Sequence, residues 1–146
     1  MSKKPHKTVI TLAVDVDNLI ADPANIDNYV TFSDNQGDDA ETPGQPGNYV
    51  STVIKGLTCE WQGVVKDNKP GEINITDVSK KSEDGGADIL EEIALGDPFD
   101  DPKVIAKVKN KDITGFEYYN VTFMINKNES LVYTIDPRLK MREKAQ

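Results

Sequence analysis

The chain has 146 residues, of which 37% are hydrophobic and 29% are charged, a composition typical of one polar, soluble globular domain. Its 25 acidic and 17 basic residues give a net charge of -8, which argues against a nucleic-acid partner because phosphate binding needs a clustered positive face. No apolar run is long enough to span a membrane, and the first residues lack the features of a signal peptide, so we expect a cytoplasmic protein with no membrane partner. Residues 1–7 and 142–146 are predicted to be flexible tails around a single domain, residues 8–141.

Most of the chain shows the period-two alternation of apolar and polar residues that is typical of strands. The first such segment, 8–17, places Ile10 and Leu12 on one face and the carboxylates of its acidic end on the other. A later segment, 57–65, places Leu57, Cys59 and Trp61 together, which predicts a buried thiol and a core tryptophan rather than a reactive cysteine or a sugar platform. Further candidate strands are 28–32, 48–54, 72–76, 87–93 and 103–109.

Turn signals separate these segments, including Pro-Gly at 43–44, 46–47 and 70–71 and four Asp-Pro steps. Short strands at this spacing predict a mainly β fold, an antiparallel β-sandwich of about eight or nine strands. A helical turn is expected over 18–26. Residues 86–96 fit a short helix and a strand about equally, because their apolar residues match both periods.

The segment 117–135 predicts the strongest hairpin. Tyr119 and Phe123 alternate inward on its first strand, and Tyr133 returns on the same face of the second. Residues 126–128 are expected to form the turn. Asp136-Pro137 is expected to end the pairing, because proline lacks the N–H that a central strand donates.

Three segments together resemble the AidA/PixA family of bacterial inclusion-body proteins. They are the opening strand VITLAVDVDNLI, the tryptophan strand LTCEWQGVV, and the closing pair EYYNVTFMI and LVYTIDPRLKM. The chain departs from the family pattern in being shorter through the middle and in having Thr134-Ile135 before its last Asp-Pro. The resemblance implies a β-sandwich in a bacterial intracellular protein, and it implies no catalytic residues.

Candidate chemistry is sparse. Asp15 and Asp17, about 7 Å apart if both lie on a strand, are the best candidates for a ligand or cation site, although solvated acids are the commoner interpretation of such a pair. His6 lies in the basic N-terminal segment, away from any expected nucleophile. Neither a Cys/His metal spacing nor a phosphate-binding glycine motif is present, so we expect no cofactor and no catalytic or metal-binding residues.

Three tyrosines complete the candidate ligand-binding set. Tyr118 falls out of phase with the core face of its strand, and Tyr29 and Tyr49 flank the acidic segment 33–48. The sequence therefore favours a non-enzymatic protein that associates with itself as a homo-oligomer. A module that binds a glycan or small molecule, with or without calcium, is the second hypothesis, and an enzyme with dispersed carboxylates is the third.

Overall fold

The first of two sheets has the strand order β2-β1-β4-β7-β6. In the computed structural model, which describes residues 7–35, 50–80, 87–95 and 103–141, β1 and β4 run parallel and the other neighbours are antiparallel. The bounds of these strands are β2 (Val30–Asp34), β1 (Thr8–Val14), β4 (Thr58–Val65), β7 (Val104–Val108) and β6 (Leu90–Leu95).

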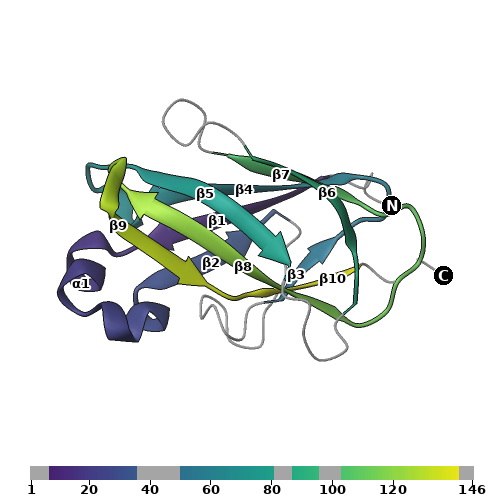
Figure 1. Cartoon of the computed structure of the whole chain (residues 1–146), viewed down its shortest axis with the longest axis horizontal. Helices are drawn as coiled ribbons and strands as arrows, with labels where there is room; N and C mark the ends of the chain where they lie inside the picture. The colour runs from purple at the N-terminus through teal and green to yellow at the C-terminus, as the bar shows by residue number, and fades with distance from the viewer. Residues whose placement is uncertain (1–6, 36–49, 81–86, 96–102, 142–146) are drawn as a thin grey trace.

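The second sheet has the order β3-β10-β8-β5, and β9 also pairs with β8. Its strands are β3 (Val50–Val53), β10 (Arg138–Met141), β8 (Phe116–Ile125), β5 (Ile73–Lys80) and β9 (Asn128–Ile135). β9 and β10 follow one another along the same side of β8, interrupted by Asp136-Pro137, and β3 runs parallel to β10. The two sheets face each other across one hydrophobic core, with the first sheet behind the second in Figure 1.

The mainly β prediction is confirmed, and the architecture corrects it in two respects. The described residues form ten strands rather than eight or nine, because the chain resumes pairing after Pro137 instead of leaving the sheet. Both sheets are mixed rather than antiparallel, since β1–β4 and β3–β10 are parallel pairs. Strand alternation gives the buried face of a strand, and it does not specify which distant strand will lie alongside.

In the described ranges, helical structure is confined to short connections. The expected turn near 18–26 is present as α1 (Val16–Ala21) and the 3-10 helix η1 (Pro23–Asn28), and a further 3-10 turn, η3 (Lys66–Asn68), follows β4. The ambiguous segment 86–96 is a strand from Leu90. No helix within the described ranges is long and apolar enough to cross a membrane.

The core assignment is confirmed for Trp61, Tyr119 and Phe123, each of which is fully buried. Leu57 and Tyr133 are only half-buried, because Leu57 precedes β4 and Tyr133 lies on β9, which borders β8 on one side only. The indole Nε1–H of Trp61 donates to the Tyr119 hydroxyl at 3.1 Å, and the two rings meet edge to face with centroids 5.5 Å apart. Segments 1–6, 36–49 and 142–146 lie outside the described residues, so most of the predicted tails and the acidic segment are not described.

Candidate functional site

The acidic end of the first strand is arranged differently from the sequence prediction. β1 ends at Val14, and Asp15 is the residue before α1, so Asp15 and Asp17 are not a pair on one strand face. The Asp15 carboxylate accepts a hydrogen bond from the Asn18 side chain at 2.7 Å, and Asp17 is exposed in the first turn of α1. Acidic residues stabilise this end of a helix through its unpaired N–H groups, which gives both aspartates a structural explanation.

Tyr29 belongs to the same region. Its backbone carbonyl accepts the Asp15 N–H at 2.8 Å, and its hydroxyl donates to Asp22 at 2.8 Å. Asp22 also accepts two hydrogen bonds from Asn25. The Asn25 amide, and next the Tyr29 hydroxyl, lower the pKa of Asp22, while the bond to Asp22 raises the pKa of Tyr29. The hydrogen bonds from Asn25 and Tyr29 therefore occupy the Asp22 carboxylate with side chains from its own region.

The remaining candidates do not join this group. Tyr118 lies on β8 in the second sheet, opposite Arg138 of β10, and Tyr49 lies outside the described residues. Within the part of the chain that the structure describes, no three His, Cys, Asp or Glu side chains form a metal-binding cluster. The structure thus brings Asp15 and Tyr29 together, and a ligand-binding role for the five candidates stays a prediction.

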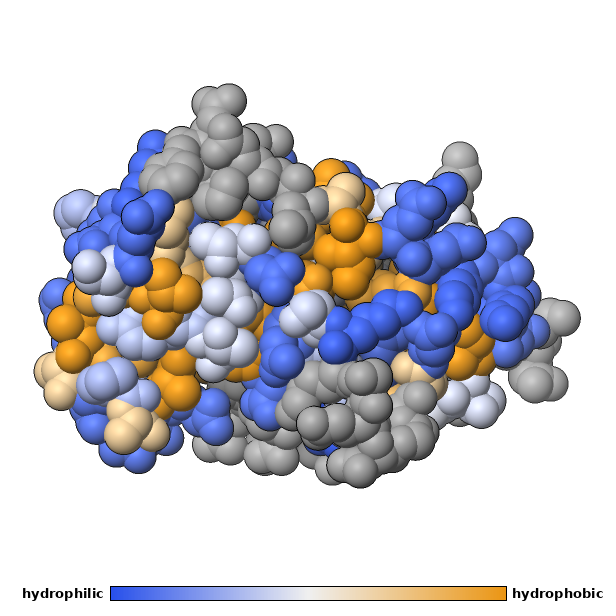
Figure 2. Space-filling view, in the orientation of Figure 1, coloured by the Kyte–Doolittle hydropathy of each residue, from blue (hydrophilic) through white to orange (hydrophobic). Residues whose placement is uncertain are grey.

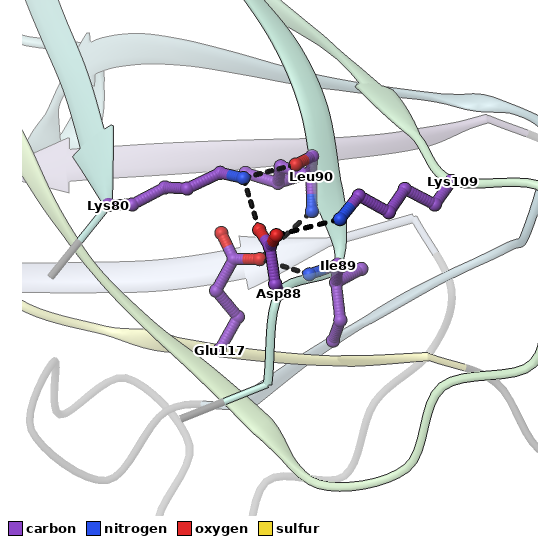
Figure 3. Close-up of polar contacts among 6 residues, drawn as sticks. All are labelled: Lys80, Asp88, Ile89, Leu90, Lys109 and Glu117. Carbon is purple, nitrogen blue, oxygen red and sulfur yellow. Dashed lines mark hydrogen bonds and ion pairs between the residues drawn. The ribbon is translucent and has the colours of Figure 1, made fainter. Parts of the chain in front are cut away.

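A charged cluster that the sequence did not suggest connects the two sheets (Figure 3). Asp88, just before β6, pairs with Lys80 at the end of β5 and with Lys109 after β7, the latter at 2.7 Å. Lys80 also donates to the backbone carbonyl of Leu90. The bond to Lys109, followed by that to Lys80, lowers the pKa of Asp88 to about 2.

Glu117 of β8 lies beneath this cluster and is only 2% exposed. Its Oε1 accepts the backbone N–H groups of Ile89 and Leu90, the latter at 2.9 Å, whereas Oε2 has no hydrogen-bond partner among the described residues. Burial raises the pKa of Glu117, against the lowering effect of the two backbone donors. The sequence contained a signal for this buried acid, because Glu117 lies two residues before Tyr119 and therefore shares the core face of their strand.

The reactive groups of the interior have structural roles. Cys59 is fully buried, and burial raises the pKa of its thiol well above the ordinary value, which disfavours the nucleophilic thiolate. Burial likewise raises the pKa of Tyr119, whose oxygen accepts from Trp61. His6 lies outside the described residues.

An open groove of about 410 Å³ lies where the chain crosses from β4 to β5. Val64, Val65 and Ile73 form its apolar part, and Lys69 and Glu72 its polar part. The strands approach closely here, since a Cβ on Gly63 would lie 2.4 Å from Ile73 Cγ2. The groove has few polar groups that converge on one point, so its lining does not define a ligand class.

The outward-facing side chains of the two sheets form two surfaces, one on each side of the sandwich. On the first sheet they form a surface that we term the first-sheet face: Thr31, Ser33, Val9, Thr11, Ala13, Thr58, Glu60, Gln62, Val64, Ile105, Lys107, Glu92 and Ala94, with the exposed Glu91 beside Glu92 at the irregularity of β6. The corresponding second-sheet face comprises Val50, Asp77, Ser79, Phe116, Tyr118, Asn120, Thr122, Val132, Thr134, Arg138 and Lys140, whereas Asn74 and Met124 are in the same register and are buried.

These two faces carry little net charge. The first-sheet face has Glu60, Glu91 and Glu92 against Lys107, and the second-sheet face has one acid and two bases, in a chain whose net charge is -8. On the side shown in Figure 2, orange and white residues predominate at the left end, near α1 and β9, and blue residues at the right end. Valine and isoleucine side chains are exposed on these flat surfaces, including Val64 (44%), Ile105 (42%) and Val132 (47%).

Comparison with known proteins supports the fold. No family model matches the chain, and no curated protein matches it. The chain is similar to the crystal structure of PixA, an inclusion body protein from Burkholderia cenocepacia J2315, with a TM-score of 0.68 and 13% identity over 97% of this chain and 98% of that one. At this identity the likeness shows a shared fold along nearly the full length of both chains.

Proposed function

We propose that this protein is a non-catalytic β-sandwich that works by associating with copies of itself in a bacterial cytoplasm, in the manner of an inclusion-body protein. The observation that carries the proposal is the charge distribution. Among the acids in the described part of the chain, Glu60, Glu91, Glu92 and Asp77 lie on the two faces of the sandwich, where aliphatic side chains are also exposed. A chain of net charge -8 repels its copies least where these faces meet.

The description of PixA as an inclusion body protein supports the proposal, since the two chains share one fold. The internal chemistry supports it as well. The best candidate carboxylates, Asp15, Asp22 and Asp88, are engaged by neighbouring side chains, and Glu117 is used to hold the backbone of β6. Surfaces rather than a reactive centre are therefore the distinctive property of this molecule.

Sedimentation and light scattering test the proposal. We expect the mass to rise above the 16.1 kDa of one chain as protein concentration increases. The useful range is from about 10 µM to about 1 mM, in which weak protein interfaces dissociate. Association should strengthen between about 0.05 and about 0.5 M salt, because salt screens the repulsion between acidic copies. A mass of 16.1 kDa under all these conditions would refute self-association.

A further inference from the structure

We infer that the copies meet through the first-sheet face, an inference that rests on the proposed self-association. This face is made by the outward side chains of β2, β1, β4, β7 and β6. Its middle consists of small, hydroxyl and amide side chains, with Thr11 opposite Ser33 on one side and Gln62 on the other. The Gln62 amide donates to the Thr11 hydroxyl at 3.1 Å, so these two polar side chains are already paired in part within the sheet.

Two of the acids on the first-sheet face, Glu60 and Glu92, have an opposite charge beside them. Glu60 pairs with Lys7 at 3.6 Å, and Glu92 lies opposite Lys107 in the register of β6 and β7. The Glu60 side chain is already only 11% exposed, so a second copy would remove little further water from it. A strongly charged partner would gain little on such a surface, whereas a second copy of this face, with most of its charges paired within the sheet, would suffer little repulsion. The occupant that fits best is another copy of this chain.

The second-sheet face is less suited to this pairing. β10 places Arg138 and Lys140 on it, and the Arg138 guanidinium lies over the Phe116 ring, 5.2 Å from its centroid. With two bases and one acid, this face would place a net positive charge opposite another if two copies met through it. Phe116, at 38% exposure, is moreover already covered on one side by Arg138.

Pairing through strand edges is disfavoured as well. Among the described strands, β2 and β3 have only five and four residues, and the registers of β5, β6 and β9 are interrupted by irregularities. The acids Glu91 and Glu92 lie on β6, and Pro137 follows β9. Short strands, bulges, charges and proline are the features by which natural sheets avoid edge-to-edge association.

The size of the first-sheet face predicts a weak complex. Five strands about 4.8 Å apart and about 23 Å long present about 550 Å² per copy. The total of about 1,100 Å² lies at the lower limit for specific interfaces. Association through this face should therefore be reversible and depend on protein concentration.

The test uses three substitutions that each add one negative charge to a strand of the full chain. Val64→Asp and Ile105→Asp place it on the first-sheet face, and Val132→Asp, at a valine of similar exposure, places it on the second-sheet face. All three variants have the same net charge, so a difference among them reports position. Circular dichroism and the thermal midpoint establish that each variant is folded before its mass is measured.

We expect Val64→Asp and Ile105→Asp each to raise the dissociation constant of the oligomer at least about tenfold, while Val132→Asp leaves it within about twofold of the wild-type value. An oligomer weakened by Val132→Asp and not by the other two would overturn the first-sheet interface and retain self-association. An oligomer that all three variants leave intact would likewise overturn the first-sheet interface and retain self-association. A wild-type chain that never exceeds the monomer mass would overturn both.

Discussion

At the scale of single residues, the central contact is between Trp61 of the first sheet and Tyr119 of the second. Both side chains are fully buried, and the indole N–H has the Tyr119 oxygen as its acceptor at 3.1 Å. A buried donor that loses its acceptor costs about 1–3 kcal/mol. The pair therefore fixes the relative position of the two sheets in a way that apolar contacts alone would not.

We expect Tyr119→Phe to lower the free energy of unfolding by about 1–3 kcal/mol, because the ring remains and only the acceptor is lost. Tyr133→Phe is the matched control. Tyr133 lies half-buried on β9, and its ring packs against Phe123 with centroids 5.8 Å apart. Removing the Tyr133 hydroxyl should therefore change the free energy of unfolding by less than about 0.5 kcal/mol. Urea unfolding followed by the fluorescence of Trp61, the only tryptophan, measures both. Equal effects of the two substitutions would contradict the role of this hydrogen bond.

At the scale of elements, the β8–β9 hairpin closes more tightly than its sequence indicates. The turn has two residues, Asn126 and Lys127, with φ of 53° and 56°, instead of the expected three. Positive φ at both positions is the hairpin turn whose twist matches that of the strands, and the second position favours glycine. Asn126 is fixed by its neighbours, since its side-chain oxygen accepts the Glu72 N–H at 2.8 Å. Lys127 therefore carries the unfavourable backbone conformation.

We expect Lys127→Gly to be more stable than Lys127→Ala by about 1 kcal/mol, since only glycine adopts positive φ without a steric penalty. Both variants lose the exposed ion pair between Lys127 and Glu72, so their difference isolates the backbone effect. The midpoints of urea unfolding provide the comparison. Greater stability of the alanine variant would mean that the turn differs from the one described.

The sequence of the segment around β6 matches both a helical and a strand pattern, and its tertiary contacts explain why it forms a strand. Leu90 lies opposite Val108 and Ala94 opposite Ile105, so β7 supplies a partner for its backbone. Glu117 accepts the N–H groups of Ile89 and Leu90 from the other sheet. A helix at this position would leave both the β7 edge and the Glu117 carboxylate without these donors.

At the scale of the whole molecule, Glu117 gives stability a dependence on pH. Its pKa is raised by burial, so the folded chain holds this proton more tightly than the unfolded chain, whose ordinary value is 4.5. The contribution of Glu117 to stability is fully present below that value and is lost as pH rises through the raised pKa. Asp88 behaves in the opposite way, because its pKa is lowered and its contribution is lost as pH falls from 3.8 toward about 2.

We expect Glu117→Gln to gain stability relative to the wild type as pH rises from about 4 to about 8, because glutamine has no proton to lose. The contribution of Asp88 is common to both chains and cancels. Glu129→Gln, at the exposed start of β9, removes the same charge and controls for the change in net charge. Urea unfolding at several pH values gives the difference in free energy. A constant difference between the wild type and Glu117→Gln over this range would contradict the assignment.

The alternation of apolar and polar residues by itself determined the class of fold and much of the core. It correctly predicted a mainly β chain and the burial of Trp61, Tyr119 and Phe123, because burial on one face requires that pattern whatever the neighbouring strand is. The resemblance to the AidA/PixA family agreed with the sandwich, and the structural likeness to PixA supports that architecture.

Only the tertiary structure decided which strands lie side by side and which charges meet. The parallel pairing of β1 with β4, the strand conformation of β6, the ion pair of Lys109 with Asp88 and the hydrogen bonds of Glu117 to β6 all join residues that are distant in sequence. Local sequence patterns do not specify such contacts, because the contacts form only when the chain folds. For the same reason, Asp15 and Asp17, which look like one strand pair in the sequence, became the start of a helix once Val14 ended its strand.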